Sequence, residues 1–585
     1  MPESPQLPPF LNVDASATGR RWLGPSAEHD RLGAAIAQAA GLPEIVGRVL
    51  ARRGVPVGEA AAHLAPALRD LMPDPSSLRD MDVAAERFVR AARNGERIAV
   101  FADYDVDGGA SAALVLTWLR GMGRDATLYV PDRIEEGYGP NVPAMRRLGE
   151  THDLIVCVDC GTLSHEPIAA AACDVIVLDH HLAGETLPPA LAMVNPNRQD
   201  EISGLGYLCA AGVVFLMLVA ANRALRRGGT TGPDLLGLLD LVALATVADV
   251  APLTGLNRAL VRQGLAVMSR AQRPGIAALT AAANLTGAPT AYGLGFVLGP
   301  RVNAGGRIGA ADLGARLLAA VDENEAAALA GRLEALNAER RAIEAAVRAQ
   351  AEAQASARAD GPLVWAAGDG WHPGVVGIVA ARLKETFGRP AVVVGFQGAD
   401  GRGSGRSVGG VDLGAAVARL AREGLIARGG GHKMAAGVSL TPGQLEPAMA
   451  RLAELLAAQG AGTRPARSLR VDGLLAAGGA TPELAERIAA AGPYGAGAPA
   501  PRLAVAGARI AGARRIGDGH LALSLADRLG GHLDAVAFRA FEGPLGPFLE
   551  SRAGAPTHLA GRLERDDWGG RPRVKLHVED AAPEG

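Results

Sequence analysis

Hydrophobic positions in the first half of the chain fall into short, almost continuous runs separated by alanine-rich stretches. The runs 98–102, 153–158 and 174–178 are rich in β-branched residues, which is typical of strands buried on both faces of a parallel sheet. The stretches between them, such as 109–121, have helical character. This alternation predicts an α/β domain over residues 76–265, built on a doubly wound parallel sheet.

The pattern then changes to a long helix followed by a second α/β unit. The stretch 322–356 places aliphatic side chains on one face and Glu and Arg on the other. We expect it to complete a helical connector over 266–356 that bridges two domains, and coiled-coil pairing is the alternative. A second α/β domain is predicted over 357–462, with strands at 362–367 and 390–395 on either side of a helix.

The two ends of the chain follow other patterns. Residues 1–75 are proline-rich with short helices, and the stretch Leu71-Met-Pro-Asp-Pro75 indicates a boundary. Over residues 463–585, several short strands with glycine-rich turns predict a small OB-like β-barrel.

Acidic side chains follow each of the three strands predicted in the first domain. The residues at these strand ends are Asp103, Asp105, Asp107, Asp159, Asp179, His180 and His181. Open α/β sheets bind ligands at the carboxyl ends of their strands, so these side chains should gather at one edge. Carboxylates this close repel one another unless cations neutralise them, and the pattern therefore indicates a divalent metal site.

The acidic motif could also be a calcium loop or a set of plain turns. The stretch Asp103–Gly108 resembles the start of an EF-hand loop, but the twelfth position is Leu114 instead of the required Glu, and a strand precedes it. Asp and Gly also commonly form plain turns after a strand. Three successive strands with such ends favour a functional site over turn chemistry.

A fourth acid lies near the end of an apolar helix predicted over 235–250. Asp249 precedes Pro252, which is a helix stop signal. Asp249 is either a further member of the acidic group or an ordinary acid at a helix end.

Two glycine clusters mark the second α/β domain, at 403–407 and 429–433. Val408 stands where a dinucleotide-binding fingerprint needs its third glycine, and no G-K-[ST] follows either cluster, so both phosphate-loop motifs are excluded. The clusters are either plain turns or backbone that lets a phosphate approach closely, with Ser404, Arg406 and His432 as donors.

Composition narrows the possible partners and cellular location of the protein. The net charge of −2 is not that of a protein that binds polyanions over its whole surface, although it leaves room for a local basic groove. Four cysteines and no recognisable signal peptide favour a reducing, cytoplasmic location. The longest apolar run, 208–221, is too short to span a bilayer, so we expect no membrane association.

The motifs D-Y-D-V-D-G at 103–108, D-C-G at 159–161, D-H-H at 179–181 and T-V-A-D at 246–249 resemble those of the DHH phosphoesterase family. The resemblance implies two Mn²⁺ or Mg²⁺ ions, with Asp159 bridging them and His181 near the phosphate. Such a pair of cations activates water and stabilises the leaving oxygen of a phosphodiester. The ligands that the resemblance implies are Asp105, Asp107, Asp159, His180 and Asp249, with Asp103 close by.

Later motifs resemble one branch of that family, the RecJ-type single-stranded-DNA-specific exonucleases. They are P-R-V-N-A-G-G-R at 300–307, W-H-P-G-V-V-G-I-V-A-A-R at 371–382, G-S-G-R-S at 403–407 and G-G-H-K-M-A-A-G at 430–437. Gly305 departs from the alanine that is more usual in the family, and Ala498 from a customary asparagine. On this resemblance the second α/β domain is DHHA1-like. The candidates for gripping DNA are Arg301, Asn303, Arg307, Ser404, Arg406 and His432.

The resemblance implies a metal-dependent exonuclease that digests single-stranded DNA from its 5′ end to mononucleotides during recombination and repair. A single-strand-binding protein and a RecQ-type helicase are the expected candidates for partners. Two alternatives stay open: a phosphodiesterase of short oligonucleotides or cyclic dinucleotides, and a non-catalytic DNA-binding scaffold. The first relatives are shorter and lack a β-rich tail, and the second would be expected to have lost some of the acids.

Overall fold

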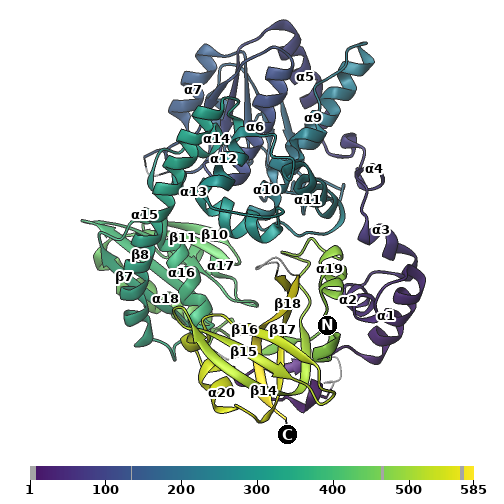
Figure 1. Cartoon of the computed structure of the whole chain (residues 1–585). Helices are drawn as coiled ribbons and strands as arrows, with labels where there is room; N and C mark the ends of the chain where they lie inside the picture. Colours follow the sequence, from purple (N-terminus) through teal and green to yellow (C-terminus); the bar gives the residue numbers. More distant parts are fainter. Residues whose placement is uncertain (1–7, 134, 463–466, 567–571, 585) are drawn as a thin grey trace. The chain divides into compact units, whose positions relative to one another are not determined.

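The computed structural model describes residues 8–133, 135–462, 467–566 and 572–584. The chain divides into two compact units (Figure 1). The larger unit comprises residues 73–252 and 260–464, and the smaller comprises residues 1–72, 253–259 and 465–585. Among the described residues, no helix combines the length and hydrophobicity needed to cross a membrane.

The first sheet of the larger unit contains five parallel strands in the order β3-β2-β4-β5-β6. Their bounds are β2 Ile98–Ala102, β3 Thr127–Tyr129, β4 Leu154–Val158, β5 Asp174–Leu178 and β6 Ala192–Val194. The pairing aligns Ala102 with Val158, and Val158 with Leu178. The carboxyl ends of β2, β4 and β5 therefore lie side by side at one edge of the sheet.

Helices cover both faces of this sheet, which confirms the doubly wound α/β fold. On one face, Met145 of α7 and Ile168 of α8 pack on Phe101 and Val177 of the strands. On the other face, α6 contacts β2, and α9 contacts β4 and β5. The helices are α5 Met81–Asn94, α6 Val106–Gly121, α7 Val142–Thr151, α8 His165–Ala169, α9 Ala210–Arg227 and α10 Leu239–Ala248.

A run of helices follows and ends in α15, the long helix predicted from the sequence. The elements are α11 Gly255–Met268, α12 Pro274–Ala282, the π-helix η5 Gly293–Leu298, α13 Gly299–Ile308, α14 Leu313–Ala319 and α15 Glu323–Ser356. Helix α15 contacts α12 and α13 and also β7 and α16 of the next sheet. It therefore bridges two α/β domains within the larger unit, as the bridging interpretation predicted.

The second sheet has the order β10-β11-β9-β8-β7, with only β7 and β8 parallel. Its elements are β7 Val364–Asp369, α16 Pro373–Phe387, β8 Ala391–Gln397, β9 Asp400–Arg406, α17 Leu413–Arg422, β10 Arg428–His432, β11 Ala435–Leu440 and α18 Pro442–Ala457. Helices α15 and α16 cover one face, and α17 and α18 cover the other.

The plain-turn interpretation of the two glycine clusters is wrong, because both lie mostly in strands. The first cluster completes β9 and the second forms most of β10. A Cβ atom on Gly403 would stand 2.7 Å from Val438 Cγ2 and 2.8 Å from Val394 Cγ2. The bulky side chains of the neighbouring strands fill the space, so glycine is required here for packing in the sheet.

The smaller unit contains the predicted barrel. Strands β14 to β18 pair in the order β14-β15-β16-β18-β17, and the pairing of β14 with β17 closes the barrel. Its elements are β12 Ser468–Arg470, β13 Gly473–Leu474, α19 Pro482–Ala490, β14 Leu503–Ile516, β15 His520–Ala526, β16 His532–Ala537, α20 Leu545–Ser551, β17 Pro556–Asp566 and β18 Arg573–Pro583.

The N-terminal residues pack with this barrel. Ile36 and Leu50 share one hydrophobic core with Leu523 and Leu559 of the strands, and Figure 1 shows the purple helices beside the yellow strands. The N-terminal elements are β1 Arg21–Leu23, α1 Ala27–Ala40, α2 Glu44–Ala51, α3 Ala60–Leu64 and α4 Leu68–Leu71. The domain boundaries drawn from the sequence stay predictions.

Candidate metal and phosphodiester site

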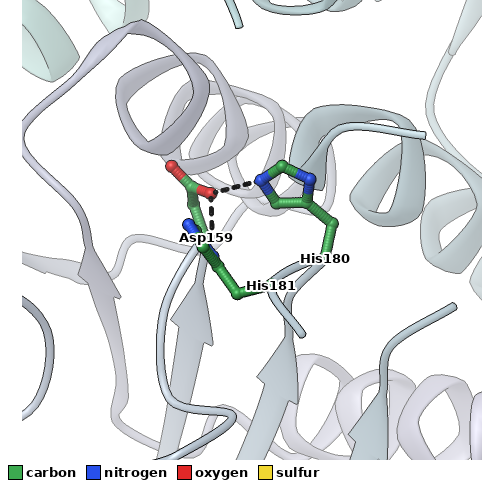
Figure 2. Close-up of side chains that lie close together, drawn as sticks. All are labelled: Asp159, His180 and His181. Atoms are coloured by element: carbon green, nitrogen blue, oxygen red, sulfur yellow. Dashed lines mark ion pairs between the residues drawn. The ribbon is translucent and has the colours of Figure 1, made fainter. Parts of the chain in front are cut away.

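Acidic and histidine side chains from separate strands converge at the carboxyl edge of the first sheet. Asp159 follows β4, and His180 and His181 follow β5. Asp159 Oδ1 lies 3.3 Å from His180 Nε2 and 3.9 Å from His181 Nδ1, and Figure 2 shows both imidazoles directed at this one carboxylate. The strand register described above is what brings these residues together.

Three overlapping groups of side chains in the described residues could each hold a metal ion. They are Asp159 with His180 and His181, Asp107 with His180 and Asp249, and Asp103 with Asp105 and Asp159. In each group one ligand atom per residue lies within 4.8 Å of the others. Asp159 and His180 each belong to two groups, as expected for adjacent cations that share ligands. All seven side chains that the sequence placed in the metal site or near its phosphate are thus in one cluster.

Backbone N–H groups at helix N-termini fix two of the acids. Asp105 caps α6, because its Oδ1 accepts hydrogen bonds from Asp107 N at 2.8 Å and Gly108 N at 3.2 Å. The carboxylate of Asp107 accepts from Ala210 N and Ala211 N, at the start of α9, at 2.7 and 2.8 Å. The positive ends of two helices therefore hold negative charge at this edge.

The loop between these acids depends on a glycine. A Cβ atom at Gly108 would stand 2.4 Å from the carbonyl oxygen of Asp103. Any side chain there would clash with the backbone of Asp103, so the glycine of the D-Y-D-V-D-G motif is needed for this close approach.

Burial makes it unfavourable for the carboxylates of this cluster to be charged when no cation is bound. The side chains of Asp103 and Asp159 are almost fully buried, and Oδ1 of each accepts no hydrogen bond from the described residues. Burial, and then repulsion from Asp105 for Asp103 and from Asp107 for Asp159, raises the pKa of both carboxyls well above their usual range. Burial and repulsion from Asp107 likewise raise the pKa of Asp249 to about 8.

These features fit divalent cations. Unpaired buried carboxylate oxygens are costly, and a cation supplies the missing positive charge. Oxygen ligands with one or two histidines favour Mn²⁺ or Mg²⁺ over a closed zinc site. The residues present therefore suit the cofactor that the sequence predicted.

An arginine group from α13 and β9 also lies in the larger unit. Arg307 Nη1 donates to Gly374 O at 3.1 Å, and Arg406 Nη1 donates to Ser404 Oγ at 2.8 Å and Gly405 O at 2.9 Å. The acceptors are uncharged oxygens, so these hydrogen bonds do not neutralise the positive charge of either guanidinium. Burial, followed by repulsion from Arg133, lowers the pKa of Arg307 to about 10 and also lowers that of Arg406. Two partly buried guanidiniums that are both repelled by a third arginine, Arg133, favour a bound anion.

Comparison with known proteins follows the same division of the chain. Residues 97–246 match the N-terminal domain of the DHH family, residues 360–458 the DHHA1 domain, and residues 471–580 the RecJ OB domain. The single-stranded-DNA-specific exonuclease RecJ of Dickeya dadantii is 41% identical over 438 residues, which cover 71% of this chain and 75% of that protein. The Escherichia coli protein of the same name is 38% identical over 439 residues, with the same coverage.

The chain belongs to the RecJ family.

Solved structures agree with this assignment to RecJ. The crystal structure of RecJ from Thermus thermophilus in complex with Mn²⁺ has a TM-score of 0.80 and 32% identity, covering 96% of this chain and 79% of that one. The complex with Mg²⁺ has a TM-score of 0.74 and 31% identity, covering 96% of this chain and 78% of that one.

Two members of the RecJ motif P-R-V-N-A-G-G-R have structural partners that the sequence did not indicate. Arg301 forms an ion pair with Glu334 and donates from Nη1 to Val297 O at 2.8 Å. Asn303 Oδ1 accepts a hydrogen bond from Val106 N at 3.0 Å, at the start of α6. Both side chains therefore connect elements of the RecJ core, and their contact with DNA stays a prediction.

The remaining nucleic-acid candidate lies on the second sheet. His432 is exposed at the end of β10, and within the described part of the chain its side chain makes no hydrogen bond or ion pair. Its role in binding DNA also stays a prediction.

Sequence reasoning placed Asp179 at a strand end without a role of its own, and it did not single out Tyr138, although both shape the RecJ site. Buried Asp179 accepts hydrogen bonds from Thr162 N at 3.0 Å, His180 N at 2.7 Å and His181 Nδ1 at 2.8 Å. Tyr138 donates its hydroxyl hydrogen to Asp159 O at 3.0 Å. Asp179 therefore orients the two histidines, and Tyr138 holds the backbone of Asp159.

A second pair of overlooked residues follows β6. Asn195 Nδ2 donates to His181 O at 2.8 Å, and Asn197 Nδ2 donates to His180 O at 2.5 Å. The rule that polar residues at strand ends belong to the site could have found them. The β6 run is only Ala192–Val194, however, and this is too short for the pattern to stand out.

Proposed function

We propose that this chain is a Mn²⁺- or Mg²⁺-dependent exonuclease that hydrolyses single-stranded DNA from the 5′ end to mononucleotides, in DNA recombination and repair. The observation that carries the proposal is the convergence of seven acidic and histidine side chains at one sheet edge. The full set of RecJ domains and the similarity to named single-stranded-DNA-specific exonucleases support it.

Asp105, Asp107, Asp159, His180 and Asp249 would hold the cations, with Asp103 beside them. When bound, two divalent cations lower the pKa of water and stabilise negative charge on the leaving oxygen of a phosphodiester. The chain contributes a rigid arrangement of these ligands. Asp107 and Asp105 are fixed by helix N-termini, and Asp159 is fixed by Tyr138.

His181 supplies positive charge beside the ligands. Burial alone would lower the pKa of His181, but the hydrogen bond to Asp179 and the neighbouring carboxylates raise it to about 9. Asp179 belongs to none of the metal-binding groups found in the described residues, so its hydrogen bond from Nδ1 favours the protonated ring with or without cations in the site. Such an imidazolium can donate its other proton to a phosphate oxygen and stabilise the charge that develops there.

The arginine group would read the 5′ end. A terminal phosphate is a dianion, and two guanidiniums with a serine hydroxyl recognise it through charge-assisted hydrogen bonds. Arg406, Ser404 and Arg307 supply these groups, and Arg133 adds positive charge. Holding the 5′ phosphate here would fix which end of the strand is digested.

The observations favour this function over the two alternatives. A non-catalytic scaffold has no need to retain buried, mutually repelling carboxylates, which cost stability without cations. A phosphodiesterase of very short oligonucleotides has no need of the OB domain at residues 471–580. A cytoplasmic location and binding to a single-strand-binding protein or RecQ-type helicase stay predictions.

The test is digestion of 5′-labelled and 3′-labelled single-stranded DNA, RNA and duplex DNA, each with Mn²⁺, Mg²⁺ or EDTA. We expect metal-dependent release of mononucleotides from the 5′ end of single-stranded DNA only. Cleavage from the 3′ end, or equal cleavage in EDTA, would overturn the proposal.

A further inference from the structure

Two large aromatic side chains form an exposed stack in the larger unit. Tyr292 is 69% exposed and Phe296 is 72% exposed. Their ring centroids are 5.0 Å apart and the ring planes differ by 26°. Single exposed apolar side chains are ordinary, but two stacked rings present one extended flat π-surface to solvent.

The segment that carries the rings lies against the end of the helix that presents Asp249. Phe296 belongs to η5, and Tyr292 immediately precedes it. A Cβ atom on Gly295 would stand 3.2 Å from Val247 Cγ1, and one on Gly299 would stand 3.3 Å from Ala248 Cβ. Glycine therefore lets this backbone pack closely on the last turn of α10, directly before Asp249.

Arg301 anchors the same segment through contacts inside the protein, so the exposed surface of the segment is formed by the aromatic rings. Its Nη1 donates to Val297 O at 2.8 Å, and its guanidinium pairs with Glu334 of α15. The charge of Arg301 is thus used inside the protein. What η5 offers to solvent is ring surface, which suits a nucleobase better than a phosphate.

We propose that Tyr292 and Phe296 stack on unpaired bases of the substrate strand close to the phosphodiester that is cleaved. This inference rests on the proposed function and adds residues that recognise the bases. Every base has a π-face, so stacking tolerates any sequence. A base within a duplex is already stacked and paired, so this contact also favours single strands. Two side chains are far too small a surface for a stable protein partner, which supports a base as the occupant.

The experiment uses the full-length protein with Mn²⁺ and a set of 5′-phosphorylated single-stranded oligonucleotides, each with one abasic residue at a successive position. Initial rates at subsaturating substrate are compared for the parent, the double variant Tyr292→Ala/Phe296→Ala and the ring-exchanged variant Tyr292→Phe/Phe296→Tyr. Val321→Ala, at an equally exposed position on the same unit, is the matched control.

We expect the alanine variant to lose about tenfold in kcat/KM on intact DNA, with most of the loss in KM, because base stacking is lost. When the missing base is one that the rings contact, at one or two positions of the oligonucleotide, the parent should show the same tenfold loss in kcat/KM. At these positions the abasic substrate should lower kcat/KM of the alanine variant only slightly below its value on intact DNA. The ring-exchanged variant and Val321→Ala should behave like the parent. The inference would be overturned if, at every position, the abasic residue lowered kcat/KM of the alanine variant by the same factor as that of the parent. An unchanged rate of the alanine variant on intact DNA would also overturn it.

Failure of the proposed function gives a different result. In that case the parent itself would not degrade the intact oligonucleotide. If the parent is active but abasic residues affect the parent and the alanine variant equally, the two rings do not stack on bases. The exonuclease assignment would then still stand.

Discussion

Arg406 Nη1 lies 2.8 Å from Ser404 Oγ on strand β9, with only Gly405 between the two residues in the chain. Alternate residues of a strand point to the same side, so the strand places a hydroxyl and a guanidinium together. Gly377 of α16 lies against both, since a Cβ atom there would stand 3.1 Å from Ser404 Oγ and from Arg406 Nη2. The strand conformation, which the turn interpretation missed, is what makes the pair a candidate phosphate site.

Arg406→Ala should reduce activity on 5′-phosphorylated single-stranded DNA much more than on the 5′-hydroxyl form. Losing a charge-assisted hydrogen bond at a partly buried site costs about 1.5–3 kcal/mol, or roughly 10- to 150-fold. The measurement is the ratio of initial rates on the two substrates. Arg402→Ala, at an exposed position on the same strand, should leave the ratio unchanged. An unchanged ratio in Arg406→Ala would show that another element reads the 5′ end.

Asp159→Asn should abolish hydrolysis while the protein stays folded. Asp159 has a φ of 60°, a conformation that asparagine adopts readily, so the backbone should be retained. The amide removes the negative charge shared by two of the metal-binding groups. Without metal, the variant should be at least as stable as the parent, because one buried, repelled carboxylate is gone.

The measurement for Asp159→Asn pairs initial rates with thermal melts in EDTA and in Mn²⁺. The parent should melt at a higher temperature in Mn²⁺, since a ligand that binds only the folded state stabilises it, and the variant should lose most of that increase. Asp153→Asn is the matched control, because Asp153 directly precedes β4 and Asp159 directly follows it. Asp153 forms an ion pair with Arg97. A variant that cleaves within tenfold of the parent at saturating Mn²⁺ would disprove the metal assignment.

Much of the site could be predicted because its logic is local. Asp159 and His180 each follow a recognisable buried strand, and parallel strands bring their ends to one edge. The long helix was equally readable, since its apolar stripe and its cap at Asp322 are both local signals.

The structural partners of the motif residues could not be predicted in the same way. Asn303 binds a backbone N–H 197 positions earlier, and Arg301 binds Glu334 on another helix. No periodicity or spacing encodes such contacts. The same is true of the N-terminal helices, whose Ile36 and Leu50 share a core with a barrel that starts at Leu503, more than 400 positions later. Only the folded chain shows that these segments need each other.

Trp22→Ala should destabilise the N-terminal residues and the barrel together. Trp22 is fully buried, its Nε1 donates to Asp580 Oδ2 at 2.9 Å, and it packs on Leu469 and Ala582. Emptying such a site costs about 3–5 kcal/mol and leaves a buried carboxylate oxygen without its donor. Hydrogen exchange should therefore rise in both parts of the smaller unit.

The functional consequence of Trp22→Ala depends on substrate length. If the barrel holds several nucleotides, cleavage of long single strands should fall far more than cleavage of very short ones. Leu529→Ala, at a highly exposed position of the same unit, should change neither property. Equal losses on long and short substrates would make the smaller unit a structural support and remove its role in DNA binding.

Val250→Gly should stabilise the larger unit and weaken the site. Val250 directly follows Asp249, is 69% exposed and has a φ of 60°. This left-handed position after a helix is normally glycine, and a β-branched residue there is strained. The side chain lines an open pocket of about 610 Å³ together with His180 and Asp249, which gives a reason for tolerating the strain.

We expect the glycine variant to gain about 0.5–1 kcal/mol in unfolding free energy, because the backbone strain is relieved, and to lose affinity for short single-stranded DNA. Denaturant melts measure the first effect and fluorescence anisotropy the second. Asn284→Gly, at a comparable φ of 52° away from the acids, is the control and should change stability only slightly and affinity not at all. Lower stability in Val250→Gly would mean that the valine side chain contributes packing that outweighs the strain.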